Sequence, residues 1–231
     1  MKPRLAKRTS VFKIPAVSRG LITVIFTLLP LTACGPSFET SPAEKMYKAI
    51  KNNSVSSVEN LLAQGVPVDI RNEAGWTPLM LAAARDKIDI IKVLLKNKAD
   101  INLREKKRQT ALHLAVKWSR VETVKYLLAE GAERDPRDYL SWTPLMWSSI
   151  QGRTEIAETL IKDGASINMA DATGNTSLIL AAGRGHSDTT DLLLAHGANI
   201  NWTNKSGQDA AAAAEKNGYT DLAKNLRAKG P

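Results

Sequence analysis

The residues best suited to chemistry are one cysteine and three histidines. Cys34 is the only thiol in 231 residues, and His113, His186 and His196 are the only imidazoles. Such groups act as nucleophiles, general bases or zinc ligands. The histidines have no metal-ligand spacing, and no Ser/His/Asp order, phosphate-binding glycine loop or carboxylate pair stands out. We therefore expect no enzyme, no catalytic residue, no metal site and no cofactor, with structural roles for all three histidines.

Cys34 ends an apolar run that follows a basic N-terminus. The first 20 residues contain six Lys or Arg and no acid, and residues 21–33 are mostly apolar. A basic segment, an apolar segment and small residues before a cleavage point are typical of a secretory signal. A membrane-spanning helix is the alternative, but 13 residues that include Pro30 fall short of the ~20 that a bilayer needs.

The residues Leu31-Thr32-Ala33-Cys34 resemble the lipobox of bacterial lipoproteins. The alternative interpretation of Cys34 is a cysteine buried in the protein core. The resemblance implies that residues 1–33 are removed, that Cys34 is lipidated, and that residues 34–41 form a short linker. Gly35 after the cysteine implies the outer membrane, facing the periplasm. Several acyl chains make anchoring stable, since one chain binds only marginally.

The predicted signal changes how the charge is interpreted. The chain has 32 basic and 23 acidic residues, a net charge of +9 that suggests nucleic acid. Removing the six basic residues of the signal leaves 26 basic residues against 23 acids, a net charge of +3. Because a periplasmic protein does not meet nucleic acid as its natural partner, we expect no nucleic acid partner.

The rest of the chain repeats every 33 residues. Three sets of residues keep this step: Thr77-Pro78-Leu79, Thr110-Ala111-Leu112, Thr143-Pro144-Leu145 and Thr176-Ser177-Leu178; Leu61-Leu62, Leu94-Leu95, Leu127-Leu128, Leu160-Ile161 and Leu193-Leu194; and Gly65, Gly131, Gly164 and Gly197. Thr suits the cap of a helix, Pro its first turn and Gly the left-handed residue after it. Residues that can begin a turn recur as Asn72, Glu105, Asp138, Asp171 and Asn204.

Segments such as GWTPLMLAAARDKIDIIKVLLKNKADIN resemble the ankyrin repeat. The resemblance covers residues 42–231 and implies an all-α solenoid of helix pairs joined by β-turn fingers, stabilised by stacking of neighbours. We expect four full repeats, at about 75–107, 108–140, 141–173 and 174–206. N- and C-terminal caps are expected at about 42–74 and 207–231.

In ankyrin repeats the fingers and the end of the first helix line a concave face. Reading these positions gives a basic, aromatic candidate site for a protein partner: Arg71, Trp76, Arg85, Arg104, Lys106, Lys107, Gln109, Lys117, Trp118, Arg137, Tyr139 and Trp142. Trp, Tyr and Arg often dominate binding energy. A solvated finger is the alternative for 105–108. Trp147 shares a column with Leu residues and is expected in the core, and Trp202 is expected to be half-buried.

The finger glycine is replaced by Arg108 and Ser141 in the middle repeats. A residue other than glycine at positive φ is strained, which marks either function or a different turn.

These observations favour a membrane-anchored, periplasmic protein-binding module whose partner presents an acidic and apolar surface. One hypothesis is an inhibitor or immunity partner that occludes a secreted or periplasmic enzyme. The chain is similar in this respect to tethered ankyrin proteins that protect bacteria from their own exported peptidoglycan hydrolases. An envelope adapter that positions or stabilises a periplasmic enzyme, such as an oxidative-stress enzyme, is the alternative; a host-directed factor is disfavoured by the lipobox.

Overall fold

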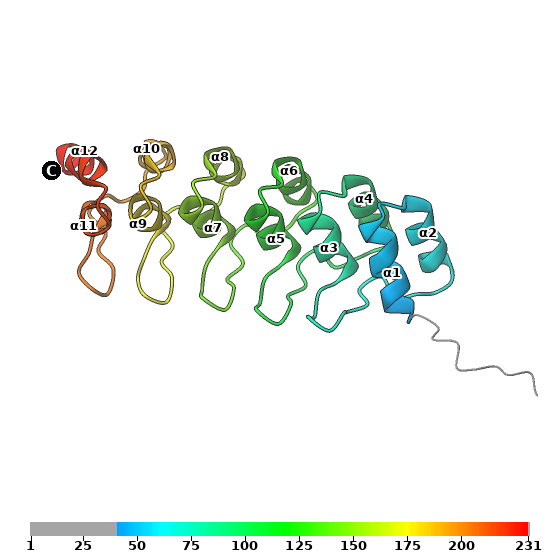
Figure 1. The fold of residues 1–231 in the computed structure, drawn as a ribbon. Coiled ribbons are helices and arrows are strands. Elements are labelled where there is room, and N and C mark those ends of the chain that lie inside the picture. The colour runs from blue at the N-terminus through cyan, green and yellow to red at the C-terminus, as the bar shows by residue number, and fades with distance from the viewer. Residues whose placement is uncertain (1–40, 231) are drawn as a thin grey trace, which may run out of the picture. The chain divides into compact units, whose positions relative to one another are not determined.

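The computed structural model describes residues 41–230, so the predicted signal, Cys34 and the linker up to residue 40 lie outside the described residues. Within 41–230 the helices form six antiparallel pairs (Figure 1): α1 Pro42–Lys51 and α2 Val55–Ala63, α3 Pro78–Ala84 and α4 Ile88–Lys96, α5 Ala111–Lys117 and α6 Val121–Ala129, α7 Pro144–Ile150 and α8 Thr154–Lys162, α9 Ser177–Ala182 and α10 Ser187–Ala195, and α11 Ala210–Lys216 and α12 Thr220–Lys229. Among these helices, none has the length and apolarity that a bilayer crossing requires.

The first helix of each internal pair begins at a threonine. The hydroxyls of Thr77, Thr110 and Thr143 accept the backbone N–H three residues later, at 3.3–3.4 Å. This satisfies one of the N–H groups that a helix start leaves unpaired. The predicted caps are thereby confirmed at three of four positions. Thr176 is the exception, because its buried hydroxyl has no partner within the described chain.

Each finger is a turn closed by one acidic or amide side chain. Asp138 illustrates the pattern: its Oδ1 accepts the N–H groups of Leu140 and Trp142, both at 2.9 Å. Glu105, Asp171 and Asn204 accept equivalent pairs of N–H groups. Arg108 and Ser141 adopt φ of 59° and 62°, while Gly174 has 86°. The middle fingers therefore keep the same left-handed turn, and non-glycine residues bear its strain.

The core is built from two buried leucine columns. Leu79, Leu112, Leu145 and Leu178 come from the first helices, and Leu94, Leu127, Leu160 and Leu193 from the second; none is more than 1% exposed. The first helices pack as one row, α1–α3–α5–α7–α9–α11, with contacts between successive members. The second helices form a parallel outer row, and the fingers project on the opposite side of the first helices (Figure 1). The apolar face of each pair is thus buried by its neighbours.

A second column of side chains joins neighbouring repeats at the backbone. Asp69, Asn102, Asp135 and Asn168 each accept the N–H of a residue 31 positions later, at 2.8–3.2 Å. The terminal pairs α1–α2 and α11–α12 stack on the same rows, where we expect caps. The residue boundaries assigned to repeats and caps stay an interpretation of the sequence.

Candidate functional site

A groove lies between the row of first helices and the fingers. One hollow of about 880 Å³ is lined by Lys48, Lys51 and Asn52 of the first pair and by the finger residues 71–74. A second, of about 340 Å³, is lined by Gly183, Arg184, Lys216 and Asn217 and by finger residues such as Thr173. Lys51 and Asn52 occupy the same repeat positions as Lys216 and Asn217, five repeats apart. The two hollows therefore occupy equivalent sites near the two ends of the row, and we name the surface between them, along the first helices and the fingers, the groove.

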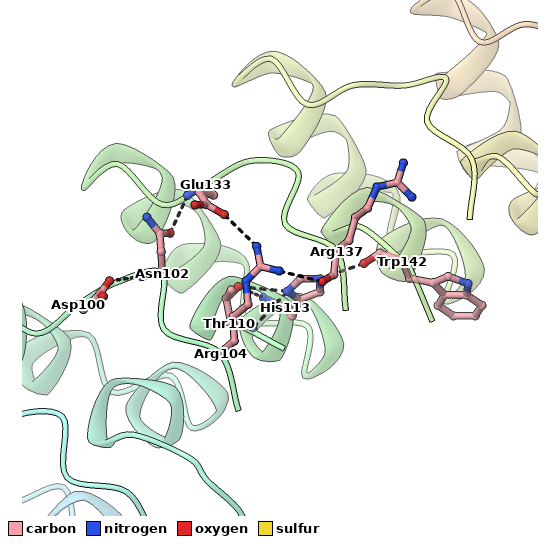
Figure 2. A network of polar contacts seen from close by, with 8 residues as sticks. All are labelled: Asp100, Asn102, Arg104, Thr110, His113, Glu133, Arg137 and Trp142. Carbon is pink, nitrogen blue, oxygen red and sulfur yellow. Dashed lines mark hydrogen bonds and ion pairs between the residues drawn. The ribbon is translucent and has the colours of Figure 1, made fainter. Parts of the chain in front are cut away.

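Three arginines of the candidate site hold neighbouring fingers together. Arg71 donates to the carbonyl oxygen of Arg104 at 2.9 Å, Arg104 to that of Arg137 at 3.2 Å, and Arg137 to that of Ala170 at 2.8 Å. Arg104 also contacts the carboxylate of Glu133 at 3.3 Å (Figure 2). The prediction that these arginines are available only to a partner was incomplete, because they also bind the scaffold. Their common 33-residue spacing was the signal of a scaffold role, and it ends at Ala170.

His113 is a fully buried bridge between repeats. Its Nδ1 accepts the N–H of Thr110 at 3.2 Å, which leaves the proton on Nε2 to be donated to the carbonyl of Trp142 at 3.1 Å (Figure 2). Burial lowers the pKa of His113 from 6.5 to about 4, despite the opposing bond to Trp142. Tyr47 occupies the same position in the first pair and donates to the carbonyls of Ile70 and Trp76.

The other two histidines also contact backbone carbonyl groups. His186 Nε2 contacts the carbonyl of Ile150 at 3.1 Å, and His196 Nδ1 contacts that of Leu192 at 2.9 Å. The expected structural roles are confirmed by these contacts.

Two tryptophans form an aromatic centre in the groove. The rings of Trp142 and Trp147 meet edge to face with centroids 5.0 Å apart, and the Lys117 ammonium lies 5.2 Å from the Trp147 centroid. Each indole N–H donates to a finger carboxylate, Trp142 to Asp171 at 3.0 Å and Trp147 to Asp138 at 2.9 Å. Trp147 was expected in the core; it is instead half-buried, packed against the core with its indole N–H bonded to the finger residue Asp138, and the equivalent Leu180 is half-buried as well.

The carboxylate of Asp171 is held ionised beneath Trp142. Burial raises its pKa, but hydrogen bonds from Thr173, Asn175 and the Trp142 indole outweigh burial and leave the pKa below its usual value. A fixed negative charge therefore lies on the side of Trp142 that faces the next finger, which fixes the orientation of that ring.

The remaining candidate residues differ in exposure. Trp118 and Tyr139 are 52% and 56% exposed, and the side chains of Arg85, Lys106 and Lys107 are also open to solvent. Trp76 is half-buried against the core. Gln109 corrects an expectation: it is only 3% exposed, and its backbone N–H closes the finger onto the buried carboxylate of Glu105. Its side chain is therefore removed from the binding surface.

Sequence reasoning missed the lysines of the first pair. Lys48 and Lys51 are exposed and line the larger hollow, although this region was interpreted only as a cap. Their alignment with Leu81 and Ala84 in the next repeat was the available signal. No group of three or more His, Cys, Asp or Glu side chains within 41–230 is arranged to hold a metal ion.

The comparisons with known proteins agree with this architecture. The model of a family described as ankyrin repeats (3 copies) matches residues 16–105, 45–138, 100–171 and 165–231. The chain belongs to the ankyrin-repeat family. Ankyrin repeats are protein–protein interaction modules and are generally non-catalytic.

Individual relatives match only a part of this chain. Proteins named "Ankyrin repeat, SAM and basic leucine zipper domain-containing protein 1" are 36% identical over 59 residues in Neofelis nebulosa, 34% over 59 in Mustela putorius furo and 36% over 63 in Dasypus novemcinctus. These matches cover 26–27% of this chain and 12–13% of the relatives. They concern the repeats alone.

Proposed function

We propose that this ankyrin-repeat protein is a lipid-anchored inhibitor or immunity partner in the bacterial periplasm. Its groove occludes an exported enzyme, such as a peptidoglycan hydrolase. The proposal combines a binding scaffold with a predicted subcellular location. The location is inferred from the basic and apolar N-terminus that ends in Leu31-Thr32-Ala33-Cys34. Lipidation of Cys34 places the solenoid at the outer membrane, where exported enzymes act.

The observation that carries the proposal is the surface of the groove. Trp118 and Tyr139 are more than half exposed there, although burying such rings inside the protein is favourable. Exposed apolar groups bordered by Lys and Arg mark binding surfaces for proteins with acidic rims. Because ankyrin repeats are interaction modules, we infer that occupancy of the groove is the means by which the protein acts on its partner.

The experiment is capture of the partner from the periplasm of the bacterium that encodes the chain, using the full chain as bait. The Trp118→Ala chain is the test variant and the Trp202→Ala chain is the control. Trp202 is also exposed, at 37%, but it lies in the segment between α10 and α11 and is not one of the candidate-site residues. If Trp118 is a hot spot, its loss weakens binding by about 2 kcal/mol, or roughly thirtyfold in Kd.

The activity of the captured enzyme then separates the hypotheses. Inhibition by the full chain, relieved by Trp118→Ala and kept by Trp202→Ala, supports an inhibitor. An enzyme that retains full activity in the complex contradicts inhibition and identifies an adapter instead. The anchor is tested separately: Cys34→Ala must abolish incorporation of a labelled fatty acid, and equal labelling of both chains rejects the lipid anchor.

A further inference from the structure

A row of cations follows the groove from one end of the solenoid to the other. Five of the six first helices carry a Lys or Arg at or just after their C-terminal end: Lys51, Arg85, Lys117, Arg184 and Lys216. Lys51, Arg184 and Lys216 line the two hollows. Arg85 and Lys117 lie at the corresponding helix ends between them: Lys117 shares its repeat position with Lys51 and Lys216, and Arg85 shares the next position with Arg184. Only α7, which ends at Ile150 and Gln151, interrupts the row.

The cations of the two helix rows differ in their partners and not in their number. Cations are favourable at any helix C-terminus, and three first helices and three second helices carry one in the last turn. The outer cations Lys162, Arg227 and Lys229 form ion pairs with Glu158, Glu215 and Asp191. Within 41–230, none of the five groove cations forms an ion pair with a carboxylate.

The acids of the groove side do not neutralise the row. Asp138 and Asp171 are occupied by backbone N–H groups and by the indoles of Trp147 and Trp142. Glu105 is buried and closes its own finger. Glu44 and Glu73 line the larger hollow, but Lys45, Lys48, Lys51 and Arg71 outnumber them there, and the smaller hollow is lined by Arg184 and Lys216 without an acid. Both hollows therefore carry a surplus of positive charge, which favours an acidic partner.

The middle of the row is apolar. Trp118 and the aromatic centre of Trp142 and Trp147 lie at α5 and α7, and the finger between these helices exposes Tyr139 and Leu140, the latter by 37%. A ligand that follows the groove meets cations, then aromatic rings, then cations again. A pure polyanion would leave these rings exposed to water.

We propose that the groove binds an extended acidic polypeptide segment with one apolar side chain near its middle. This rests on the protein-binding role proposed above and names the chemistry of the bound segment. Six first helices at 8–10 Å spacing span about 45 Å, which an extended chain of about 14 residues covers. The apolar side chain packs on the aromatic centre while carboxylates meet Lys51 and Arg85 on one side and Arg184 and Lys216 on the other.

The test uses the full chain and a fluorescein-labelled peptide of about 14 residues, all glutamate except for one central tryptophan, at low salt. The groove variant is Arg85→Glu, Arg184→Glu and Lys216→Glu together. The control is Lys92→Glu, Lys125→Glu and Lys162→Glu, which has the same net charge but alters the outer helices. We expect Kd to rise at least about tenfold in the groove variant and less than about twofold in the control, and thermal melting checks that both variants are folded at the temperature of the binding measurement.

A second pair of measurements tests the apolar centre. Trp118→Ala should weaken the tryptophan peptide about tenfold and leave an all-glutamate peptide unchanged. An equal loss of peptide affinity in both triple variants would show an effect of net charge alone and would overturn the proposal. So would tighter binding of heparin through the same cations, or a Trp118→Ala chain with unchanged affinity. These measurements involve no envelope fraction, so their failure leaves the capture of an inhibited enzyme standing.

Discussion

The middle and fourth repeats share one backbone but differ in how their fingers are held. In the middle repeats, His113, Trp142 and Trp147 reach from helices and fingers to acceptors on neighbouring segments. At the equivalent positions the fourth repeat has Ile179, Asn175 and Leu180. Its finger closes with Gly174 and with Asn175 bonded to Asp171 and Asn204. The comparison teaches that the fold requires only the turn and the leucines, so the bonds made by His113, Trp142 and Trp147 are additions of the middle repeats.

The largest expected effect is a loss of stability in acid that belongs to the middle repeats. Folding lowers the pKa of His113 from 6.5 to about 4, so the unfolded chain binds a proton that the folded chain does not. The contribution is complete above pH 6.5 and is lost as the pH falls toward 4, by up to about 3 kcal/mol. Urea midpoints across this range measure it, and His113→Leu must flatten this part of the slope; an unchanged slope rejects the assignment.

The next effect is the cost of His113→Leu itself at neutral pH. Leucine keeps much of the volume but leaves the carbonyl of Trp142 and the N–H of Thr110 without their partners. We expect a loss of about 2 kcal/mol in the free energy of unfolding. Ile179→Leu is the matched change in the fourth repeat and should cost less than about 1.5 kcal/mol. Equal costs at the two sites would remove the distinction between the repeats.

A smaller loss of stability is expected when Trp147 of the aromatic centre is replaced by leucine, the residue at the equivalent position of the fourth repeat. Trp147→Leu restores the side chain found at Leu180 and removes the indole N–H that binds Asp138. Because Trp147 is only half-buried, the loss should be about 1 kcal/mol. Thermal melting measures this change. A loss of several kcal/mol would place the ring in the core after all.

The smallest effect concerns the left-handed finger residue. Arg108→Gly relieves a φ of 59° and should stabilise the chain by about 0.5–1 kcal/mol. Gly174→Ala is the opposite change, at a φ of 86°, and its added Cβ would meet the Lys205 nitrogen at 2.9 Å. It should therefore destabilise, and by more. Denaturant titrations measure both changes in the free energy of unfolding. If the two substitutions changed it in the same direction, the two fingers would not share the same left-handed turn.

Much of the fold followed from the sequence because its signals are local and repeated. The threonine caps and the turn residues such as Asp138 act within four residues, so their types predicted their contacts. Side chains that act on the next repeat were harder to assign. Arg104 and Gln109 were both read as free, although one binds a carbonyl 33 residues on and the other is buried at a finger base. Such contacts depend on the stacking distance, which a single repeat does not encode.

The orientation of the arginine contacts has a consequence for biosynthesis. Arg71, Arg104 and Arg137 each donate toward the C-terminus, to a finger that is translated later. When a new finger leaves the ribosome, the guanidinium that binds its carbonyl is already present on the preceding repeat. For these three finger carbonyls, assembly from the N-terminus therefore supplies the donor before the acceptor, whereas assembly from the other end would supply it afterwards.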